Sequence, residues 1–257
     1  MYFSVQHLYI SFGGVTAVND LSFEVNQGEI YSIIGPNGAG KTTTYNLITG
    51  FLKADRGRIE FKGRDLIGLP PNRIARLGLT RTFQKTNVYP NVTVLDAVLM
   101  GSHNQIKVSL MDILFSTRRF KETEERVREN GLRILGFLGL EDRADTLAKN
   151  LSYGEQRRLE IAIALALEPE LLLLDEPAAG MNPNEANAVM SVIAKIRNRG
   201  ITVILVEHNM DVVMNISDRV AVLDYGTKIC EGPPAAVQDD QCVLEAYLGK
   251  GFADAQL

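Results

Sequence analysis

The chain of 257 residues is poor in cysteine and carries no excess of basic charge. Its two cysteines, Cys230 and Cys242, are too few for a disulfide framework and lack the spacing of metal ligands. The formal net charge is -4, whereas a nucleic-acid-binding domain usually carries a basic patch. These scarcities argue against a disulfide-stapled secreted domain and against a nucleic-acid partner, and they favour a reducing, cytoplasmic setting.

Long apolar segments are also missing. The N-terminus, MYFSVQHLYISFGG, has no basic region followed by an apolar stretch, so we expect no signal peptide. The most apolar segments, residues 159–167 and 171–175, are far shorter than the roughly 20 residues of a membrane-spanning helix. We expect a soluble protein that reaches a membrane only through a partner.

Strand and helix patterns alternate in the last third of the chain. Residues 170–175, ELLLLD, and 201–207, ITVILVE, are short apolar runs that predict strands buried on both faces. An amphipathic helix pattern over residues 184–199 separates them, and residues 219–232 predict a hairpin. Together with the strand patterns of the first third, this alternation predicts an α/β fold with a mainly parallel sheet.

The middle of the chain has a different character. From about residue 92 to 168 the periodicity is helical, which predicts a helical subdomain inserted into the α/β core. Within it, residues 102–120 follow no clear pattern. Their apolar side chains include Ile113, Leu114, Phe115 and Phe120. These side chains are compatible with a core, a helix face or a partner surface, and we favour core packing.

Residues 35–42, GPNGAGKT, match the phosphate-binding pattern G-x-x-x-x-G-K-[ST] between a predicted strand and a predicted helix. Glycines there let backbone N–H groups turn toward a polyphosphate, and the helix N-terminus adds its dipole. Lys41 would pair with the β and γ phosphates, and Thr42 would offer a hydroxyl to Mg²⁺. The predicted nucleotide-binding residues of this segment are Gly35, Pro36, Asn37, Gly38, Ala39, Gly40, Lys41, Thr42 and Thr43.

Two acids follow the predicted strand LLLLD. Asp175 ends that strand, where a buried carboxylate is costly without a partner such as a metal ion. Mg²⁺ keeps several of its waters, so Asp175 would hold it through the water shell. Glu176 comes next and can orient or deprotonate an attacking water. The alternative is a pair of acids that merely starts a loop.

Two further polar residues follow predicted strands. His208 comes directly after ITVILVE, at the carboxyl end of a strand, where open α/β sheets bind ligands. Its imidazole could reach a γ-phosphate there, although it could also simply start the next helix. Gln84 follows LTRTF, and its amide oxygen could complete a metal shell.

Residues 151–158, LSYGEQRR, contain a helix start. Ser152 and Glu155 have the spacing of a capping box. Gly154 then falls in the first helical turn, where glycine costs roughly 1 kcal/mol relative to alanine. A cap alone does not require that glycine, whereas a helix N-terminus that receives an anion benefits from an uncovered backbone.

The motifs GPNGAGKT, LSYGEQ and LLLLDEP, with Gln84 and His208, resemble the ATP-binding subunit of ABC transporters in their order and across nearly the whole chain. LSYGEQ is similar to the family signature, which other P-loop classes lack. Further segments resemble the ATPase subunits of branched-chain amino-acid importers, and the long insertion before LSYGEQ resembles the longer of their two paired ATPases. These segments are FGGVTAVNDLSFEV, LTRTFQ, DEPAAGMNP, ICEGPP and VLEAYLG.

The resemblance implies a role for each matching residue. Phe12 would stack on adenine with Val18 beside it. Thr42, Gln84 and Asp175 would bind Mg²⁺ directly or through its waters. Glu176 would be the catalytic base, His208 would sense the γ-phosphate, and Lys41 would pair with the phosphates. Ser152 and Gly154 would contact the γ-phosphate of ATP held by the opposite protomer. The signature differs from the usual pattern at Tyr153 and Glu155, and Asn182 stands where an aspartate is usual.

The resemblance also implies an architecture: a P-loop NTPase core with a mainly parallel sheet, N-terminal antiparallel strands and an inserted helical subdomain. The whole chain, 1–257, would be one ABC ATPase domain. Residues 1–84 and 169–257 would form the nucleotide-binding core, and residues 85–168 the helical subdomain with the signature.

The expected function is that of an ATP-hydrolysing subunit, at the cytoplasmic face of the cell membrane, in an importer for branched-chain or related amino acids. ATP and Mg²⁺ are the expected cofactors. Transmembrane permease subunits, an identical or similar second ATPase, and a periplasmic or extracellular solute-binding protein within the complex are the expected partners. The alternatives are another cargo (urea, another amide or a lipid), a soluble ABC-type ATPase acting on nucleic acid or ribosomes, and a regulator that binds nucleotide without turnover.

Overall fold

The computed structural model describes residues 2–82, 90–102 and 109–248. Contacts within the chain divide it into two compact units. Unit 1 comprises the chain up to Arg81 together with the chain from Glu170 onward, and unit 2 comprises Thr82–Pro169. Among the described residues, no helix combines the length and the apolar character that a membrane crossing requires.

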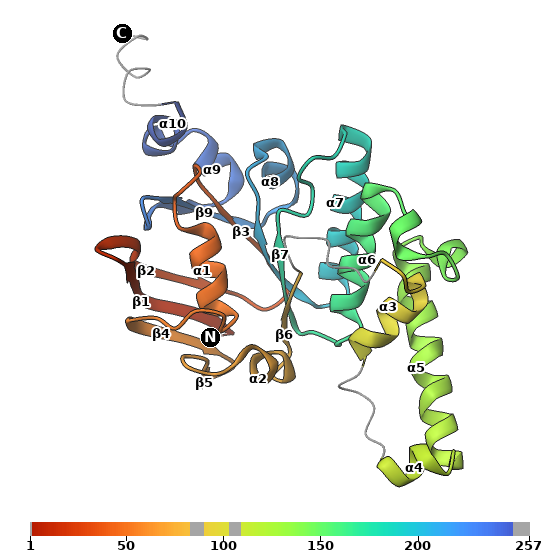
Figure 1. The fold of residues 1–257 in the computed structure, drawn as a ribbon. Helices are drawn as coiled ribbons and strands as arrows, with labels where there is room; N and C mark the ends of the chain where they lie inside the picture. Colours follow the sequence, from red (N-terminus) through yellow and green to blue (C-terminus); the bar gives the residue numbers. More distant parts are fainter. Residues whose placement is uncertain (1, 83–89, 103–108, 249–257) are drawn as a thin grey trace. The chain divides into compact units, whose positions relative to one another are not determined.

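Unit 1 contains two β-sheets (Figure 1). The first is antiparallel, in the order β2 (Val15–Val25), β1 (Phe3–Phe12), β4 (Arg56–Phe61), β5 (Arg64–Asp65). The second has the order β10 (Thr227–Gly232), β9 (Arg219–Asp224), β3 (Ile30–Ile34), β8 (Thr202–Val206), β7 (Leu171–Asp175), β6 (Leu79–Arg81). Its strands are parallel except for β10, which forms a hairpin with β9.

The central strands of the second sheet form because their sequences are apolar on both faces. Every residue of β3, β7 and β8 is buried, as expected for a parallel sheet that is covered on both sides. Around the sheets lie α1 (Lys41–Ile48), α2 (Pro71–Arg76), α7 (Pro183–Asn198), α8 (Met210–Ile216), α9 (Pro234–Gln238) and α10 (Gln241–Leu248).

A single large core joins both sheets to α1. It contains Leu8 and Leu21 of the antiparallel sheet, Leu173 of the parallel sheet and Tyr45 of α1. The rings of Phe23 and Tyr31 stack across the two sheets with their centroids 5.2 Å apart. The loop between β3 and α1 is therefore attached at both ends to elements that are buried in the same core.

Unit 2 is helical. Its elements are α3 (Val94–Gly101), α4 (Leu110–Leu114), α5 (Arg118–Phe137), the 3-10 turns η2 (Glu141–Arg143) and η3 (Ala148–Asn150), and α6 (Tyr153–Leu165). Gly131 lets α5 lie close to α3, because a Cβ there would come within 3.2 Å of the side chains of Leu95 and Leu99.

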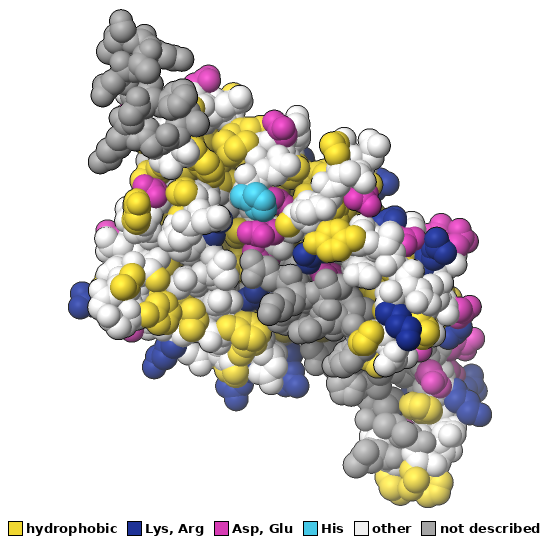
Figure 2. Space-filling view, turned by 45° about the horizontal axis from the view of Figure 1, so that its top comes forward, with side chains coloured by type: hydrophobic (Ala, Val, Ile, Leu, Met, Phe, Trp, Pro, Cys, Tyr) yellow, Lys and Arg dark blue, Asp and Glu magenta, His cyan; other side chains and the backbone are white. Residues whose placement is uncertain are grey.

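The structure confirms the predicted fold class, with its antiparallel N-terminal strands, parallel sheet and helical middle segment. The predicted core packing within residues 102–120 is wrong for Leu114 and Phe115, which are 74% and 66% exposed. Leu114 is the last residue of the five-residue helix α4 and Phe115 follows that helix, while Met111 within it is also exposed. Figure 2 shows apolar side chains at the surface where α4 lies.

Candidate active site

The loop between β3 and α1 has the conformation of a phosphate loop. Gly35, Gly38 and Gly40 all have positive φ, at 148°, 85° and 96°. Gly40 is the N-cap of α1 and provides no side-chain hydrogen bond to it. The first N–H groups of a helix have no partner within the helix, so this end of α1 keeps backbone donors for an anion.

Close packing explains two of these glycines. A Cβ on Gly35 would lie 2.1 Å from the carbonyl oxygen of Leu223, and a Cβ on Gly40 would lie 2.5 Å from that of Ala17. A Cβ on Gly38 would meet no atom within 4 Å. The left-handed conformation favours glycine at all three positions, whereas only Gly35 and Gly40 also need it for space.

This difference gives a stability prediction. We expect Gly35→Ala to lower the free energy of unfolding by about 2 to 5 kcal/mol, because overpacking adds to the cost of the left-handed conformation. Gly38→Ala is the matched control and should cost about 1 to 2 kcal/mol, since it carries the conformational cost alone. Urea unfolding measures both. Equal losses would show that the approach to Leu223 does not constrain Gly35.

Lys41 begins α1 and turns its side chain back onto the loop. Its Nζ donates hydrogen bonds to the carbonyl oxygens of Gly35, at 2.6 Å, and Pro36, at 2.9 Å. Burial lowers the pKa of the Lys41 ammonium below its ordinary value, and the nearby carboxylates of Glu176 and Asp175 oppose that shift. A buried ammonium beside open backbone donors fits a polyphosphate.

Asp175 is the last residue of β7 and is 2% exposed. Its carboxylate lies 3.7 Å from the guanidinium of Arg81, at the end of the neighbouring strand β6. Arg81 donates to Asn46 and Thr49 of the α1 segment, at 2.8 and 3.1 Å. Its guanidinium also lies over the ring of Tyr45, 5.1 Å from the centroid. Arg81 therefore links Asp175 to the helix that follows the phosphate loop.

Glu176 and His208 lie together at the carboxyl ends of β7 and β8. Nδ1 of His208 is 3.7 Å from Oε1 of Glu176, and both side chains are partly exposed. The backbone of Glu176 has a φ of 47°, and its N–H donates to the carbonyl oxygen of Val206 at 2.8 Å. The parallel register, which pairs Asp175 with Val206, brings these two loops side by side.

Sequence reasoning missed Glu207 and Arg81. Glu207 is fully buried, and its carboxylate accepts hydrogen bonds from the backbone N–H groups of Ala178 and His208, at 2.9 and 3.1 Å. Glu207 carries a signal in the sequence, since it is a charged residue directly after the apolar strand TVILV, whereas Arg81 ends the short strand LTR, which also contains a threonine. The sequence does not reveal their partners, which come from distant segments.

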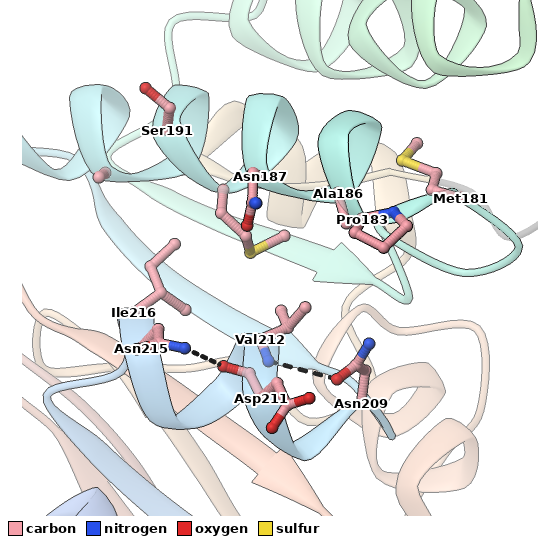
Figure 3. A pocket seen from close by; sticks show the side chains of 12 residues that line it. Met181, Pro183, Ala186, Asn187, Ser191, Asn209, Asp211, Val212, Asn215 and Ile216 are labelled. Carbon is pink, nitrogen blue, oxygen red and sulfur yellow. Dashed lines mark hydrogen bonds between the residues drawn. The ribbon is translucent and has the colours of Figure 1, made fainter.

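The loops after β7 and β8 each lead into a capped helix. Asn182 caps α7 through a complete capping box with Glu185, and Asn209 caps α8 by accepting from the N–H of Val212. A groove of about 410 Å³ runs between these two helices, and Figure 3 shows Met181 and Asn209 at its loop end. Asn182 thus performs the capping role that an aspartate would also perform.

The remaining predicted residues of unit 1 differ in exposure. Phe12 ends β1 and is 47% exposed, which leaves its ring accessible for stacking. Val18 is fully buried in the main core, so its side chain offers no open surface beside Phe12. Thr42, in the first turn of α1, is exposed.

Unit 2 contains the predicted signature. Ser152 is the N-cap of α6, and the predicted capping box with Glu155 is confirmed: Ser152 accepts from the Glu155 N–H, and the Glu155 carboxylate accepts from the Ser152 N–H. Gly154 lies in the first turn and is buried. Gln84 lies outside the described residues.

The oxygen ligands that this site offers to a metal ion suit Mg²⁺ bound together with a nucleotide better than a metal ion held by protein side chains alone. Within the described parts of the chain, no group of three or more His, Cys, Asp or Glu residues could enclose a metal ion. Thr42 and Asp175 provide a hydroxyl and a carboxylate. Mg²⁺ commonly binds through one or two carboxylates together with substrate phosphates, so these residues fit it.

Comparison with known proteins gives a consistent result. Residues 18–179 match the ABC transporter family, and residues 227–253 match the family of branched-chain amino acid ATP-binding cassette transporters. The chain is 43% identical over 248 residues to LivG of Salmonella typhimurium, a high-affinity branched-chain amino acid transport ATP-binding protein, covering 96% of this chain and 97% of LivG. It is 40% identical to BraF of Pseudomonas aeruginosa, a protein of the same description, with coverage of 96% and 97%.

A solved structure agrees with these relatives. It is the ADP conformation of an ATP-binding cassette of an ABC transporter, and it is 34% identical to this chain. The two structures have a TM-score of 0.85, covering 97% of this chain and 99% of the other. The similarity therefore extends over both units of the chain.

Proposed function

Because the chain belongs to the ABC transporter family and within it to the ATP-binding subunits, we propose that it hydrolyses ATP to drive an importer of branched-chain or related amino acids. The proposal rests on one observation above all: Glu176 and His208 lie 3.7 Å apart at the carboxyl edge of the parallel sheet. The family match of residues 227–253 and the names of the relatives support branched-chain amino acids as the cargo.

The chemistry requires a small number of groups from this chain. Glu176 would orient and deprotonate the attacking water, while Lys41 and the N-terminus of α1 would stabilise charge on the phosphates. His208 would contact the γ-phosphate from the next loop. Phe12 would stack on the adenine ring.

Mg²⁺, when bound with ATP, would neutralise phosphate charge, with Thr42, Asp175 and Gln84 attending it. The partly exposed carboxylate of Glu176 remains available for water, since the Arg81 side chain approaches Asp175 instead. The two adjacent acids would thus have separate roles, one toward the metal and one toward the water.

The two units would correspond to a nucleotide-binding core and a helical subdomain. In our proposal Ser152 and Gly154 contribute to the ATP site of a second, identical or similar subunit, and the dimer works on transmembrane permease subunits. The complex would include a periplasmic or extracellular solute-binding protein, and this chain would lie at the cytoplasmic face of the membrane.

The experiment that tests the proposal is reconstitution in two steps. The purified chain should hydrolyse ATP in the presence of Mg²⁺. The membrane proteins that copurify with it should then be reconstituted in vesicles with their solute-binding protein. We expect leucine, isoleucine or valine, but not urea, to raise the ATPase rate. Stimulation by urea alone would change the cargo, and copurification with ribosomes or DNA would reject the transporter role.

The shared site gives a separate prediction for Ser152. We expect Ser152→Arg to lower turnover at least tenfold, because a large cation would cover the N-terminus of α6 where the second subunit presents ATP. ATP binding to the monomer should stay within twofold of the wild type, as measured by fluorescence titration. An equal loss of binding and turnover would place Ser152 at the chain's own phosphate loop and contradict a shared site.

A further inference from the structure

The buried acid Glu207 has no role in the function described so far. It follows β8 and precedes His208, and it is 0% exposed. Burying a carboxylate is costly, and well-packed apolar residues usually stabilise such a position at least as well. The residues before it, Leu205 and Val206, are buried and apolar. A negative charge here therefore requires an explanation other than the stability of the strand.

Both oxygens of Glu207 bind backbone N–H groups, and they reach two different loops. Oε1 accepts from Ala178, two residues after Glu176, at 2.9 Å. Oε2 accepts from His208 at 3.1 Å and, with a longer bond of 3.5 Å, from Asn209. One side chain thus joins the loop after Glu176 to the loop that carries His208.

We propose that Glu207 is a positioning residue for ATP hydrolysis, which holds Glu176 and His208 at their observed separation. This inference rests on the proposed function. Its geometric basis is that the segment from Glu176 to Ala178 is fastened at both ends. The N–H of Glu176 binds the carbonyl of Val206, and the N–H of Ala178 binds Glu207. Pro177, between them, has no N–H to contribute.

These two hydrogen bonds hold the backbone of Glu176 in an unfavourable conformation. Glu176 has a φ of 47°, a left-handed conformation that costs a non-glycine residue about 1 to 3 kcal/mol. Such a conformation persists only where the surroundings impose it. Without the bond to Ala178, the loop can rotate toward a more common conformation, and the carboxylate of Glu176 then moves away from His208.

Glu207 also places a negative charge near the imidazole. Its Oε2 lies 4.0 Å from Nδ1 of His208, the same nitrogen that is 3.7 Å from Glu176. The ring therefore has one carboxylate fixed by buried hydrogen bonds and one that is partly open to solvent. The fixed carboxylate favours a single orientation of the ring, with Nδ1 directed toward the two acids.

Apolar packing should keep the loop folded when Glu207 is changed. Ala178 belongs to a small buried cluster with Ala186 of α7 and Val212 of α8, and Met181 packs against it. These contacts are independent of the carboxylate. A variant of Glu207 should therefore lose positioning before it loses its fold.

The test is Glu207→Gln, in which an amide NH₂ faces a backbone N–H in place of an acceptor oxygen. We expect kcat for ATP to fall about 10- to 100-fold, the range that corresponds to losing one buried charged hydrogen bond. KM and the ATP dissociation constant should stay within twofold, because the hydrogen bonds of the Glu207 side chain in the described part of the chain go to Ala178, His208 and Asn209, and none goes to the phosphate loop or Phe12.

Glu29→Gln is the matched control. Glu29 is also buried, at 9% exposed, and accepts from the backbone N–H of Asn26 at 2.7 Å. It precedes β3, so it lies at the opposite edge of the parallel sheet from Glu207. We expect a comparable loss of stability without a fall in kcat. If both variants lose turnover in proportion to their stability, Glu207 is merely structural.

Amide hydrogen exchange makes the test independent of activity. Glu207→Gln should speed exchange at Ala178 and His208, whereas Glu29→Gln should not. Unchanged exchange at Ala178, or an unchanged kcat, would overturn the inference. A wild-type chain that hydrolyses no ATP would instead reject the proposed function, and the exchange result would still decide whether Glu207 holds the two loops together.

Discussion

Glu176→Gln should hydrolyse ATP about 100- to 10,000-fold more slowly than the wild type, the usual contribution of a positioned general base. An amide has nearly the shape of a carboxylate but cannot accept a proton from water. The backbone of Glu176 is held by its N–H bond to Val206, which the substitution does not touch. The fold and the phosphate loop should therefore remain intact.

Binding and assembly separate this effect from a general defect. We expect the variant to bind ATP as tightly as the wild type and to accumulate as an ATP-bound dimer in gel filtration. Glu185→Gln is the matched control, because glutamine at this third helical position still completes the capping box with Asn182. Turnover of Glu176→Gln within threefold of the wild type would show that another group activates the water.

The sequence predicted those features whose determinants are local. The phosphate loop, the strand before it and the helix after it occupy one continuous segment, residues 30–48, and the structure has all three. The capping box at Ser152 is also local, since its two partners are three residues apart. The structure shows the backbone conformation of these residues, whereas their roles in binding ATP stay predictions.

The features that the sequence did not predict depend on partners from distant segments. Arg81 and Asp175 lie 94 positions apart in the sequence and meet because β6 pairs with β7. Glu207 reaches Ala178 because β7 pairs with β8. In each case a charged residue at the end of an apolar strand was visible, but its partner depended on the strand order. The order of neighbouring strands is set by the whole sheet.

Leu114 and Phe115 illustrate a different limit. Periodicity identifies the buried face of a helix only over several turns, and α4 has five residues. The exposure of these side chains could not be predicted from their hydrophobicity, because apolar atoms contribute more than half of most protein surfaces. Val18 shows the converse, since a residue predicted beside adenine is fully buried in the core.

Lys41→Met should abolish nucleotide binding without destabilising the fold. The ATP dissociation constant should rise more than about 100-fold, because the variant loses a buried ammonium that would form charge-assisted bonds to phosphate. Burial lowers the pKa of Lys41, so the ammonium is less stable in this loop than in water, although the carboxylates of Glu176 and Asp175 oppose that shift. An apolar side chain of similar length should therefore cost the folded state little and can stabilise it.

The pH dependence of the free energy of unfolding tests whether burying the Lys41 ammonium costs the folded state stability. Because the pKa of Lys41 is lowered from 10.5 in the folded state, the unfolded chain binds more protons between the two pKa values. The free energy of unfolding of the wild type should then rise relative to Lys41→Met as the pH increases through that window. Lys53→Met, at an exposed lysine, is the control for nucleotide binding and should leave the ATP dissociation constant unchanged. If Lys41→Met unfolds at lower urea concentration than the wild type at pH 7, the bonds to Gly35 and Pro36 outweigh desolvation. In that case Lys41 stabilises the folded chain in the absence of nucleotide, and the same side chain favours both ATP binding and folding.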